Sequence, residues 1–176
     1  MSASRALVIT VSDRAARGVY TDRSGPLLVV GLRSIGLEVA GPVVVPDGDP
    51  VRLALEQAVS DGWDLVVTSG GTGLGVRDLT PEITTAMLDR PVPGIAELLR
   101  ASAAAQGVPA AMLSRGVAGV VQRTLVVNVA GSAGAARHAV AVLGPLLGHA
   151  LDQLRGHDHT PASGDPGDQM GRAGGQ

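Results

Sequence analysis

Apolar residues follow two patterns that alternate along the chain. Some form short unbroken runs, and others recur every three or four positions over longer stretches. Unbroken runs are typical of buried strands, whereas the wider spacing is typical of helices. The runs predict strands at residues 6–11, 43–45, 65–68, 112–121 and 124–128.

Capping residues, prolines and glycines mark where the predicted helices begin and end. Asp22 or Ser24 is expected to cap one helix, which Gly36 ends. A capping residue followed by proline at the first helical position begins two more helices, near residues 49 and 80. A fourth helix is expected over residues 95–102, and Ser132 caps the last, which Pro145 is expected to break or kink.

Strands that alternate with helices predict an α/β domain with a mostly parallel sheet and helices on both faces. Ligands bind such sheets outside the carboxyl ends of the strands. We therefore expect the chemistry just after Val11, Val45, Thr68 and Asn128. The domain is expected to span residues 1–156. Residues 157–176 are rich in Gly, Pro, Asp, Ser and His and are expected to form a disordered tail.

Composition excludes several kinds of chemistry. All 14 basic residues are Arg, which rules out a Schiff-base lysine and the lysine of a P-loop. Cysteine is absent, which rules out thiolate catalysis and disulfides. Aromatic residues make up 1% of the chain and the net charge is −2, so a nucleic-acid partner is not expected. No membrane-spanning run or signal peptide is visible, and we expect a cytoplasmic location without membrane contact.

A glycine-rich loop, Ser69-Gly70-Gly71-Thr72-Gly73, follows the strand at residues 65–68. Glycines allow successive backbone N–H groups to point at one anion, and the hydroxyls add donors. The loop therefore favours phosphate binding, although a flexible turn with positive φ angles is the alternative.

Asp47 and Asp78 lie in loops near predicted strand ends and could hold Mg²⁺ together. Acidic residues are also common in turns, so spacing alone favours no special role for them.

The remaining polar candidates have structural explanations of equal or greater weight. Arg115 could bind a phosphate or carboxylate, or form a surface ion pair. Capping and the helix dipole explain residues 80–82. Residues 128–132 could bind an anion at a helix N-terminus or form an ordinary turn. His138 and His149 fall in helical patterns, and His157-Asp158-His159 in the tail are expected to be solvated rather than to bind a metal.

Taken together, motifs spread over residues 5–155 match one family in order and spacing. The chain resembles the molybdopterin adenylyltransferases of molybdenum cofactor biosynthesis, with the related Mog- and MoaB-like proteins and the N-terminal domain of gephyrin. The matching motifs are Val11-Ser12-Asp13-Arg14, Gly18-Val19-Tyr20, Asp22, Gly25-Pro26, Pro46-Asp47, Thr68-Ser69-Gly70-Gly71-Thr72-Gly73, Arg77-Asp78, Thr80-Pro81-Glu82, Pro93-Gly94, Leu113-Ser114-Arg115, Asn128 and Gly131-Ser132.

The resemblance implies a three-layer α/β/α sandwich, usually a homotrimer, that binds molybdopterin and ATP with Mg²⁺. It implies transfer of AMP from ATP to the terminal phosphate of molybdopterin, giving adenylylated molybdopterin and pyrophosphate. A molybdate-insertion protein would use that product. Asp47 and Asp78 match the catalytic acids and would position Mg²⁺. The implied substrate-binding residues are Ser12, Asp13, Ser69, Gly70, Gly71, Thr72, Gly73, Ser114, Asn128, Gly131 and Ser132.

One loop departs from the family pattern. The family usually has Asn-Leu-Pro-Gly-Ser-Pro, whereas residues 128–133 are Asn-Val-Ala-Gly-Ser-Ala and lack both prolines. Each loss could cost up to about 1 kcal/mol of loop order, which predicts a looser pocket on that side. The altered loop mildly favours one alternative, a molybdopterin-binding protein that does not transfer AMP, whereas retention of Asp47 and Asp78 argues against it. A second alternative is the molybdate-insertion domain of the same superfamily, which occurs in much longer chains than this one.

Overall fold

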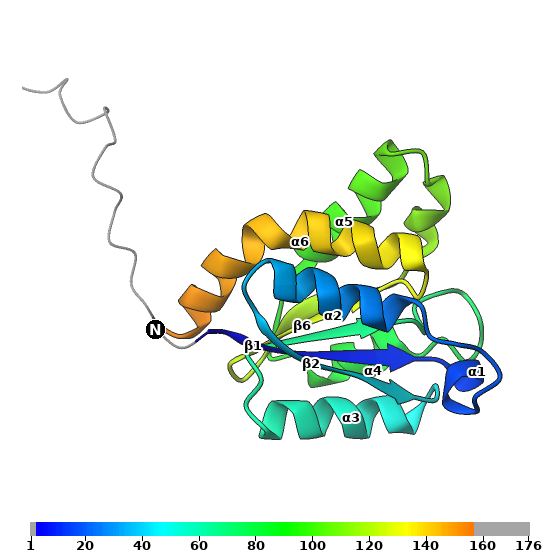
Figure 1. The fold of residues 1–176 in the computed structure, drawn as a ribbon, viewed down its shortest axis with the longest axis horizontal. Coiled ribbons are helices and arrows are strands. Elements are labelled where there is room, and N and C mark those ends of the chain that lie inside the picture. Colours follow the sequence, from blue (N-terminus) through cyan, green and yellow to red (C-terminus); the bar gives the residue numbers. More distant parts are fainter. Residues whose placement is uncertain (1–2, 157–176) are drawn as a thin grey trace, which may run out of the picture.

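The computed structural model describes residues 3–156 (Figure 1). The predicted tail at residues 157–176 lies outside the described residues. It includes His157, Asp158 and His159, so the structure does not test whether they bind a metal. No helix in the described part of the chain is long and apolar enough to cross a membrane.

The centre of the fold is a six-stranded sheet in the order β2-β1-β3-β6-β5-β4. Strands β2, β1, β3 and β6 run parallel, and β5 and β4 continue the sheet in antiparallel pairing. The predicted mostly parallel sheet is therefore confirmed. The strands are β1 (Arg5–Val11), β2 (Glu38–Val45), β3 (Leu65–Ser69), β4 (Arg90–Pro91), β5 (Ala118–Val121) and β6 (Thr124–Val129).

Helices cover both faces of this sheet, which confirms the three-layer α/β/α sandwich. In Figure 1, α2 and α6 lie on one face, and α3 and α4 lie on the other. The helices are α1 (Asp13–Ala16), α2 (Ser24–Ser34), α3 (Asp49–Ser60), α4 (Thr80–Met87), α5 (Pro93–Ala105), the 3₁₀ helix η1 (Pro109–Leu113) and α6 (Ala133–Leu154).

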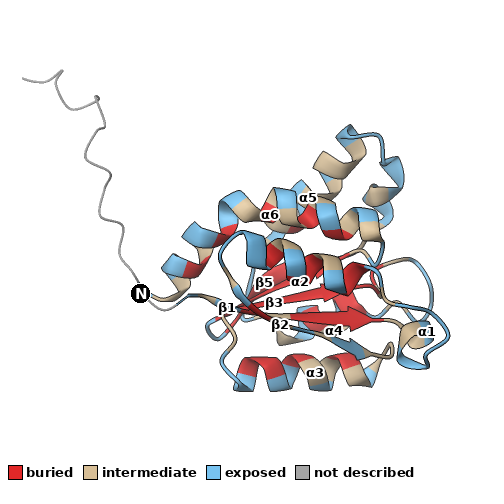
Figure 2. Ribbon diagram, in the orientation of Figure 1, coloured by how far each residue is buried: buried red, intermediate tan, exposed pale blue. Residues whose placement is uncertain are grey.

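The two faces of the sheet are packed by alternate residues of the same strands. Val8 and Val67 face the α2 and α6 layer, whereas their neighbours Ile9 and Val66 face the α3 layer. All four are fully buried, and Figure 2 shows the central strands as the buried part of the molecule. Burial on both faces explains why these strands are unbroken apolar runs rather than alternating ones.

Three local predictions differ from the structure. Residues 112–117 are not strand, because the chain first forms η1 and pairs with β6 only from Ala118. Pro145 does not break α6, which runs over 22 residues. Leu143 and Leu147, on either side of Pro145, are buried against the sheet layer, and this packing holds the helix together. The third difference concerns helix caps. The N-cap residues of α2, α3 and α4 are Arg23, Gly48 and Leu79 rather than the predicted Asp22 or Ser24, Asp49 and Thr80, and none of the three makes a side-chain cap hydrogen bond.

Candidate functional site

The order of the strands places a crevice at the carboxyl ends of β1 and β3. From the end of β1 the chain passes through α2 to β2 on one side, and from the end of β3 it passes through α4 toward β4, β5 and β6 on the other side. The two connecting helices lie on opposite faces of the sheet (Figure 1). Adjacent strand ends whose connections leave in opposite directions are where open α/β sheets bind ligands.

A cleft of about 340 Å³ lies at this position. It is lined by the end of β1, the end of β3, the segment before α2 and the start of α6. Four of the predicted substrate-binding residues line it: Ser12, Ser69, Gly131 and Ser132. The fold therefore brings together residues from three distant parts of the sequence, as their positions after predicted strands indicated.

The glycine-rich loop beside the cleft depends on the absence of a side chain at Gly70. Its φ is +108°, and a Cβ there would lie 2.2 Å from the carbonyl oxygen of Val11. The N–H of Gly70 donates to the carbonyl of Val129 at 3.0 Å, so this amide is used within the fold. Among the described residues, the N–H groups of Gly71, Thr72 and Gly73 have no backbone or side-chain acceptor. Three consecutive donors thus remain for an anion.

Two acidic residues join the ends of β1 and β2. The N–H of Asp13 donates to Asp47 Oδ2 at 3.1 Å, and the N–H of Asp47 donates to Asp13 Oδ1 at 3.2 Å. Arg77 binds both carboxylate oxygens of Asp13, with its Nε 2.6 Å from Oδ2 and its Nη2 3.0 Å from Oδ1. The segment after the glycine-rich loop is thereby tied to the start of α1.

The two acids differ in the direction of their pKa shifts. Partial burial would raise the pKa of Asp13, but its hydrogen bonds and charge interaction with Arg77 outweigh burial and lower it. Burial raises the pKa of Asp47, and the negative charges of Asp13 and Asp78 add to this against the hydrogen bond from the Asp13 backbone. Asp47 is therefore a carboxylate in a negative, partly dehydrated environment, which favours a cation nearby.

Asp47 and Asp78 both lie close to the glycine-rich loop. A Cβ built on Gly71 would be 2.9 Å from Asp47 Oδ1, and one built on Gly73 would be 2.9 Å from Asp78 Oδ2. Asp78 Oδ2 also accepts the N–H of Gly75 at 2.9 Å. The fold thus brings the two predicted catalytic acids to the same loop, although they are 31 positions apart in the sequence.

Three oxygen atoms near this loop are shielded from solvent and have no hydrogen-bond partner in the described part of the chain: Asp47 Oδ1, Ser69 Oγ and Thr80 Oγ1. A buried polar atom without a partner costs about 1–3 kcal/mol, so a group of them needs an explanation. Sequence reasoning missed Thr80 because its place before Pro81 resembles a helix cap. In the structure Thr80 lies inside α4 and is 1% exposed.

Arg115 closes the loop rather than reaching into the cleft. Its Nε donates to the carbonyl of Gly73 at 2.7 Å, and its other nitrogens bind the carbonyl of Asp78 and the carboxylate of Glu82. The side chain therefore forms an ion pair with Glu82 and also connects Gly73, at the end of the loop, to Asp78. Its neighbour Ser114 donates through Oγ to Thr72 Oγ1 at 3.1 Å, which places this predicted site residue against the loop.

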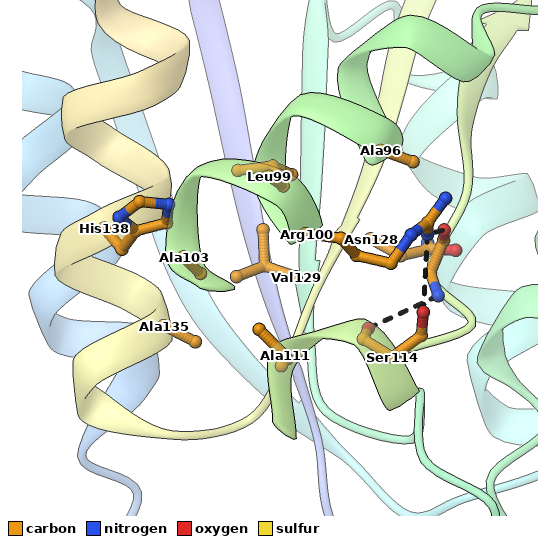
Figure 3. Close-up of a pocket in the computed structure, with 12 residues that line it drawn as sticks. Ala96, Leu99, Arg100, Ala103, Ala111, Ser114, Asn128, Val129, Ala135 and His138 are labelled. Carbon is orange, nitrogen blue, oxygen red and sulfur yellow. Dashed lines mark hydrogen bonds between the residues drawn. The ribbon is translucent and has the colours of Figure 1, made fainter. Parts of the chain in front are cut away.

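Asn128 is buried and holds several elements together. Its side-chain N–H groups donate to Thr68 Oγ1 at 2.9 Å and Thr84 Oγ1 at 3.0 Å, and its carbonyl accepts the N–H of Val117 at 3.2 Å. It also lines a small apolar cavity of about 60 Å³ between α5, η1, β6 and α6. Figure 3 shows Asn128, Arg100 and Ser114 together on one side of this cavity, and His138 on the other.

His138 has a structural environment, as its helical pattern indicated. Its Nε2 lies 2.9 Å from Ser102 Oγ, which links α6 to α5. Across the residues that the structure describes, no three His, Cys, Asp or Glu side chains come close enough together to hold a metal ion. A metal at this site would therefore need ligands beyond carboxylates, such as hydroxyls, substrate oxygens or water.

Comparison with known families agrees with this arrangement. Residues 7–149 match the family model described as "Probable molybdopterin binding domain". The chain belongs to this family. The match to the molybdopterin-binding family includes every predicted site residue, from Ser12 to Ser132.

Two curated relatives of the family differ in how much of their length the chain covers. The chain is 40% identical over 159 residues to the "Molybdenum cofactor biosynthesis bifunctional protein" of Chlorobaculum tepidum. This alignment covers 89% of the chain but spans only about half, 50%, of that relative. The chain is 34% identical over 154 residues to the "Molybdopterin adenylyltransferase" of Helicobacter pylori (strain J99), covering 85% of the chain and 87% of that protein.

A solved structure supports the fold as well as the family. The molybdopterin biosynthesis Mog protein from Mycobacterium ulcerans is 45% identical to the chain, with a TM-score of 0.80. The superposition covers 89% of the chain and 99% of that structure. The strand ends and loops described above therefore belong to a shared domain rather than to a local similarity.

Proposed function

We propose that this chain is a molybdopterin adenylyltransferase of molybdenum cofactor biosynthesis. It would transfer AMP from ATP to the terminal phosphate of molybdopterin, releasing pyrophosphate and giving adenylylated molybdopterin. The Helicobacter pylori relative carries the name of this activity and is covered over 87% of its length. The observation that carries the proposal is the loop at Gly71–Gly73, which has three unpaired N–H groups and lies close to both Asp47 and Asp78.

This arrangement suits transfer of a nucleotidyl group. Such transfer needs alignment of the attacking and leaving oxygens and neutralisation of charge, with little covalent help from the protein. The phosphate of molybdopterin is already an anionic nucleophile, so no general base is needed. The amides of Gly71, Thr72 and Gly73 would bind phosphate oxygens and hold the reacting group in place. The hydroxyls of Ser12, Ser69 and Ser132 would line the adjoining cleft.

The residues present also fit a Mg²⁺ ion. Asp47 Oδ1 is an unpartnered carboxylate oxygen. Burial raises the pKa of Asp47, the negative charges of Asp13 and Asp78 add to this, and a bound cation would offset both effects. Asp47 and Asp78 would hold the ion, and bound Mg²⁺ would supply charge neutralisation at the phosphate oxygens. Asp47 keeps its orientation through its two hydrogen bonds with Asp13.

AMP transfer tests this proposal directly. Purified chain is incubated with ATP, Mg²⁺ and molybdopterin, and adenylylated molybdopterin is followed by chromatography. We expect Asp47→Asn and Asp78→Asn to reduce the rate by about 10²–10³, the usual scale for loss of one preorganised electrostatic contact. Asp49→Asn is the matched control, because this carboxylate is 86% exposed and lies two residues from Asp47. Wild-type rates in both variants would overturn the assignment of the two acids.

One observation favours a second function, that of a molybdopterin-binding protein without transferase activity. The loop at residues 128–133 lacks the two prolines that the family pattern contains, and Gly131 and Ser132 of this loop line the cleft. Retention of molybdopterin without ATP turnover would support this alternative. Product formation by the wild type would exclude it.

Several further properties are part of the proposal. We propose a homotrimer, a cytoplasmic location, and transfer of the product to a molybdate-insertion protein. Size-exclusion chromatography with light scattering tests the trimer. Molybdate-dependent release of AMP by the chain alone would instead favour the molybdate-insertion activity of the same superfamily.

A further inference from the structure

Thr80 is the buried polar residue that the proposed function leaves unexplained. It is the first residue of α4 and 1% exposed, and its Oγ1 has no hydrogen-bond partner among the described residues. Its backbone N–H donates to the carbonyl of Gly71 at 3.1 Å, which fixes α4 against the glycine-rich loop. The backbone is therefore held by a good bond while the hydroxyl beside it is left without one.

The hydroxyl of Thr80 and the free oxygen of Asp47 face the same side of Gly71. A Cβ built on Gly71 would lie 2.3 Å from Thr80 Oγ1 and 2.9 Å from Asp47 Oδ1. Both oxygens are shielded from solvent, and both lack partners. Two such atoms on one side of one glycine carry a combined cost that a single ligand could remove.

The chemistry of the two atoms selects a divalent cation as that ligand. An ionised carboxylate oxygen only accepts, so it needs a donor or a cation, and a phosphate placed against it would be repelled. A hydroxyl oxygen can offer a lone pair to a cation as well. One hydroxyl and one carboxylate are also how P-loop enzymes hold the Mg²⁺ that accompanies a bound nucleotide. Among the described residues, no three His, Cys, Asp or Glu side chains come close enough together to hold a metal ion. A hydroxyl oxygen would therefore supply a ligand that the carboxylates alone do not.

We propose that Thr80 Oγ1 is a protein ligand of a divalent cation, together with Asp47 Oδ1. The inference rests on the proposed function for the purpose of the ion, but the cation can be tested without either substrate. Both atoms are shielded from solvent in this structure, and the ion would replace the partners that they lack.

Binding of Mn²⁺ to the nucleotide-free chain, measured by electron paramagnetic resonance, tests the proposal. We expect Thr80→Val, which keeps the shape and removes the hydroxyl, to weaken Mn²⁺ binding at least about tenfold, and Thr80→Ser to restore most of it. Thr124→Val is the control, because it removes a hydroxyl that is 2% exposed and donates to the carbonyl of Trp63 in another part of the fold. It should keep wild-type Mn²⁺ affinity.

Each outcome bears on the cation site separately from the transferase. Wild-type Mn²⁺ affinity in a folded Thr80→Val variant overturns the proposal, and so does a wild-type chain that binds no Mn²⁺ at all. Normal AMP transfer with either of those results leaves the proposed function standing without this ligand. Loss of Mn²⁺ binding in Thr80→Val, with no AMP transfer by the wild type, supports the cation site and overturns the transferase.

Discussion

Asp13 and Asp47 exchange two hydrogen bonds, each through the backbone N–H of one and the carboxylate of the other, at 3.1 and 3.2 Å. The exchange joins the residues that follow β1 and β2, 34 positions apart in the sequence. It uses Asp47 Oδ2 and leaves Oδ1 free beside Gly71. The orientation of the proposed catalytic carboxylate is thus set by a neighbouring acid, whose negative charge adds to the effect of burial in raising the pKa of Asp47.

Removal of the charge at Asp47 should stabilise the protein at neutral pH. Because the pKa of Asp47 is raised in the folded state, its contribution to stability is present at low pH and is lost as pH rises through the folded pKa. We expect Asp47→Asn to melt above the wild type at pH 7.5, with the difference narrowing toward pH 4. Thermal unfolding across this pH range measures it, with Asp49→Asn as the control. A pH-independent difference would contradict this electrostatic origin.

A side chain at Gly70 should lower the unfolding free energy by more than its positive φ alone explains, because it would also clash with Val11. Gly36 also has a positive φ, +94°, but a Cβ there would meet nothing within 4 Å, whereas at Gly70 it would lie 2.2 Å from the carbonyl oxygen of Val11. We expect Gly36→Ala to cost about 1–2 kcal/mol of unfolding free energy. Gly70→Ala should cost about 1–3 kcal/mol more through the added clash. Urea unfolding compares the two, and equal losses would show that the contact with Val11 is relieved without cost.

Arg115→Lys should loosen the glycine-rich loop without unfolding the domain. Lysine keeps the charge but cannot bind the carbonyls of Gly73 and Asp78 and the carboxylate of Glu82 together. We expect faster hydrogen exchange at residues 73–78 and a higher KM for ATP, with a change in melting temperature of only a few degrees. Arg52→Lys, which alters an exposed ion pair with Glu56, should change neither quantity. If hydrogen exchange at residues 73–78 is unchanged in Arg115→Lys, contacts other than those of Arg115 keep this segment ordered.

The start of α6 should accept one of the two prolines that the family pattern contains. Ala133 is the first residue of α6, where the N–H has no partner within the helix and the fixed φ of proline is favourable. We expect Ala133→Pro to raise the unfolding free energy by about 0.4–1 kcal/mol. Ala135→Pro should instead be destabilising, because the N–H of Ala135 donates to Ser132 Oγ at 3.0 Å. Chemical denaturation measures both, and a loss of stability in Ala133→Pro would contradict the idea that the missing proline loosens the loop.

Much of the fold could be predicted from local patterns. The apolar runs located β1, β3 and β6 because strands buried on both faces have apolar residues at every position. The strand after Leu113 was placed too early, since the apolar residues Met112 and Leu113 are exposed in η1 rather than buried in the sheet. Apolar character alone does not distinguish these two environments.

The candidate site was predicted in part. Asp47, Asp78 and the glycine-rich loop follow predicted strands, and the structure places both acids beside that loop, with their catalytic roles still to be tested. Spacing alone could not favour the acids over ordinary turn residues, and the family resemblance singled them out. Thr80 was assigned to a cap because a threonine before proline has the same local sequence in either role.

The sequence by itself determined where strands and loops occur and which residue types occupy the strand ends, because these follow from local apolar spacing, prolines and glycines. Only the tertiary structure decided which side chains meet. The bonds of Asp13 with Asp47, and the burial of Thr80 beside Gly71, depend on how distant segments pack. The same holds for Arg115, whose partners lie 33 to 42 positions away. Contacts over such separations are set by the whole sheet and its helices, so no single stretch of sequence contains them.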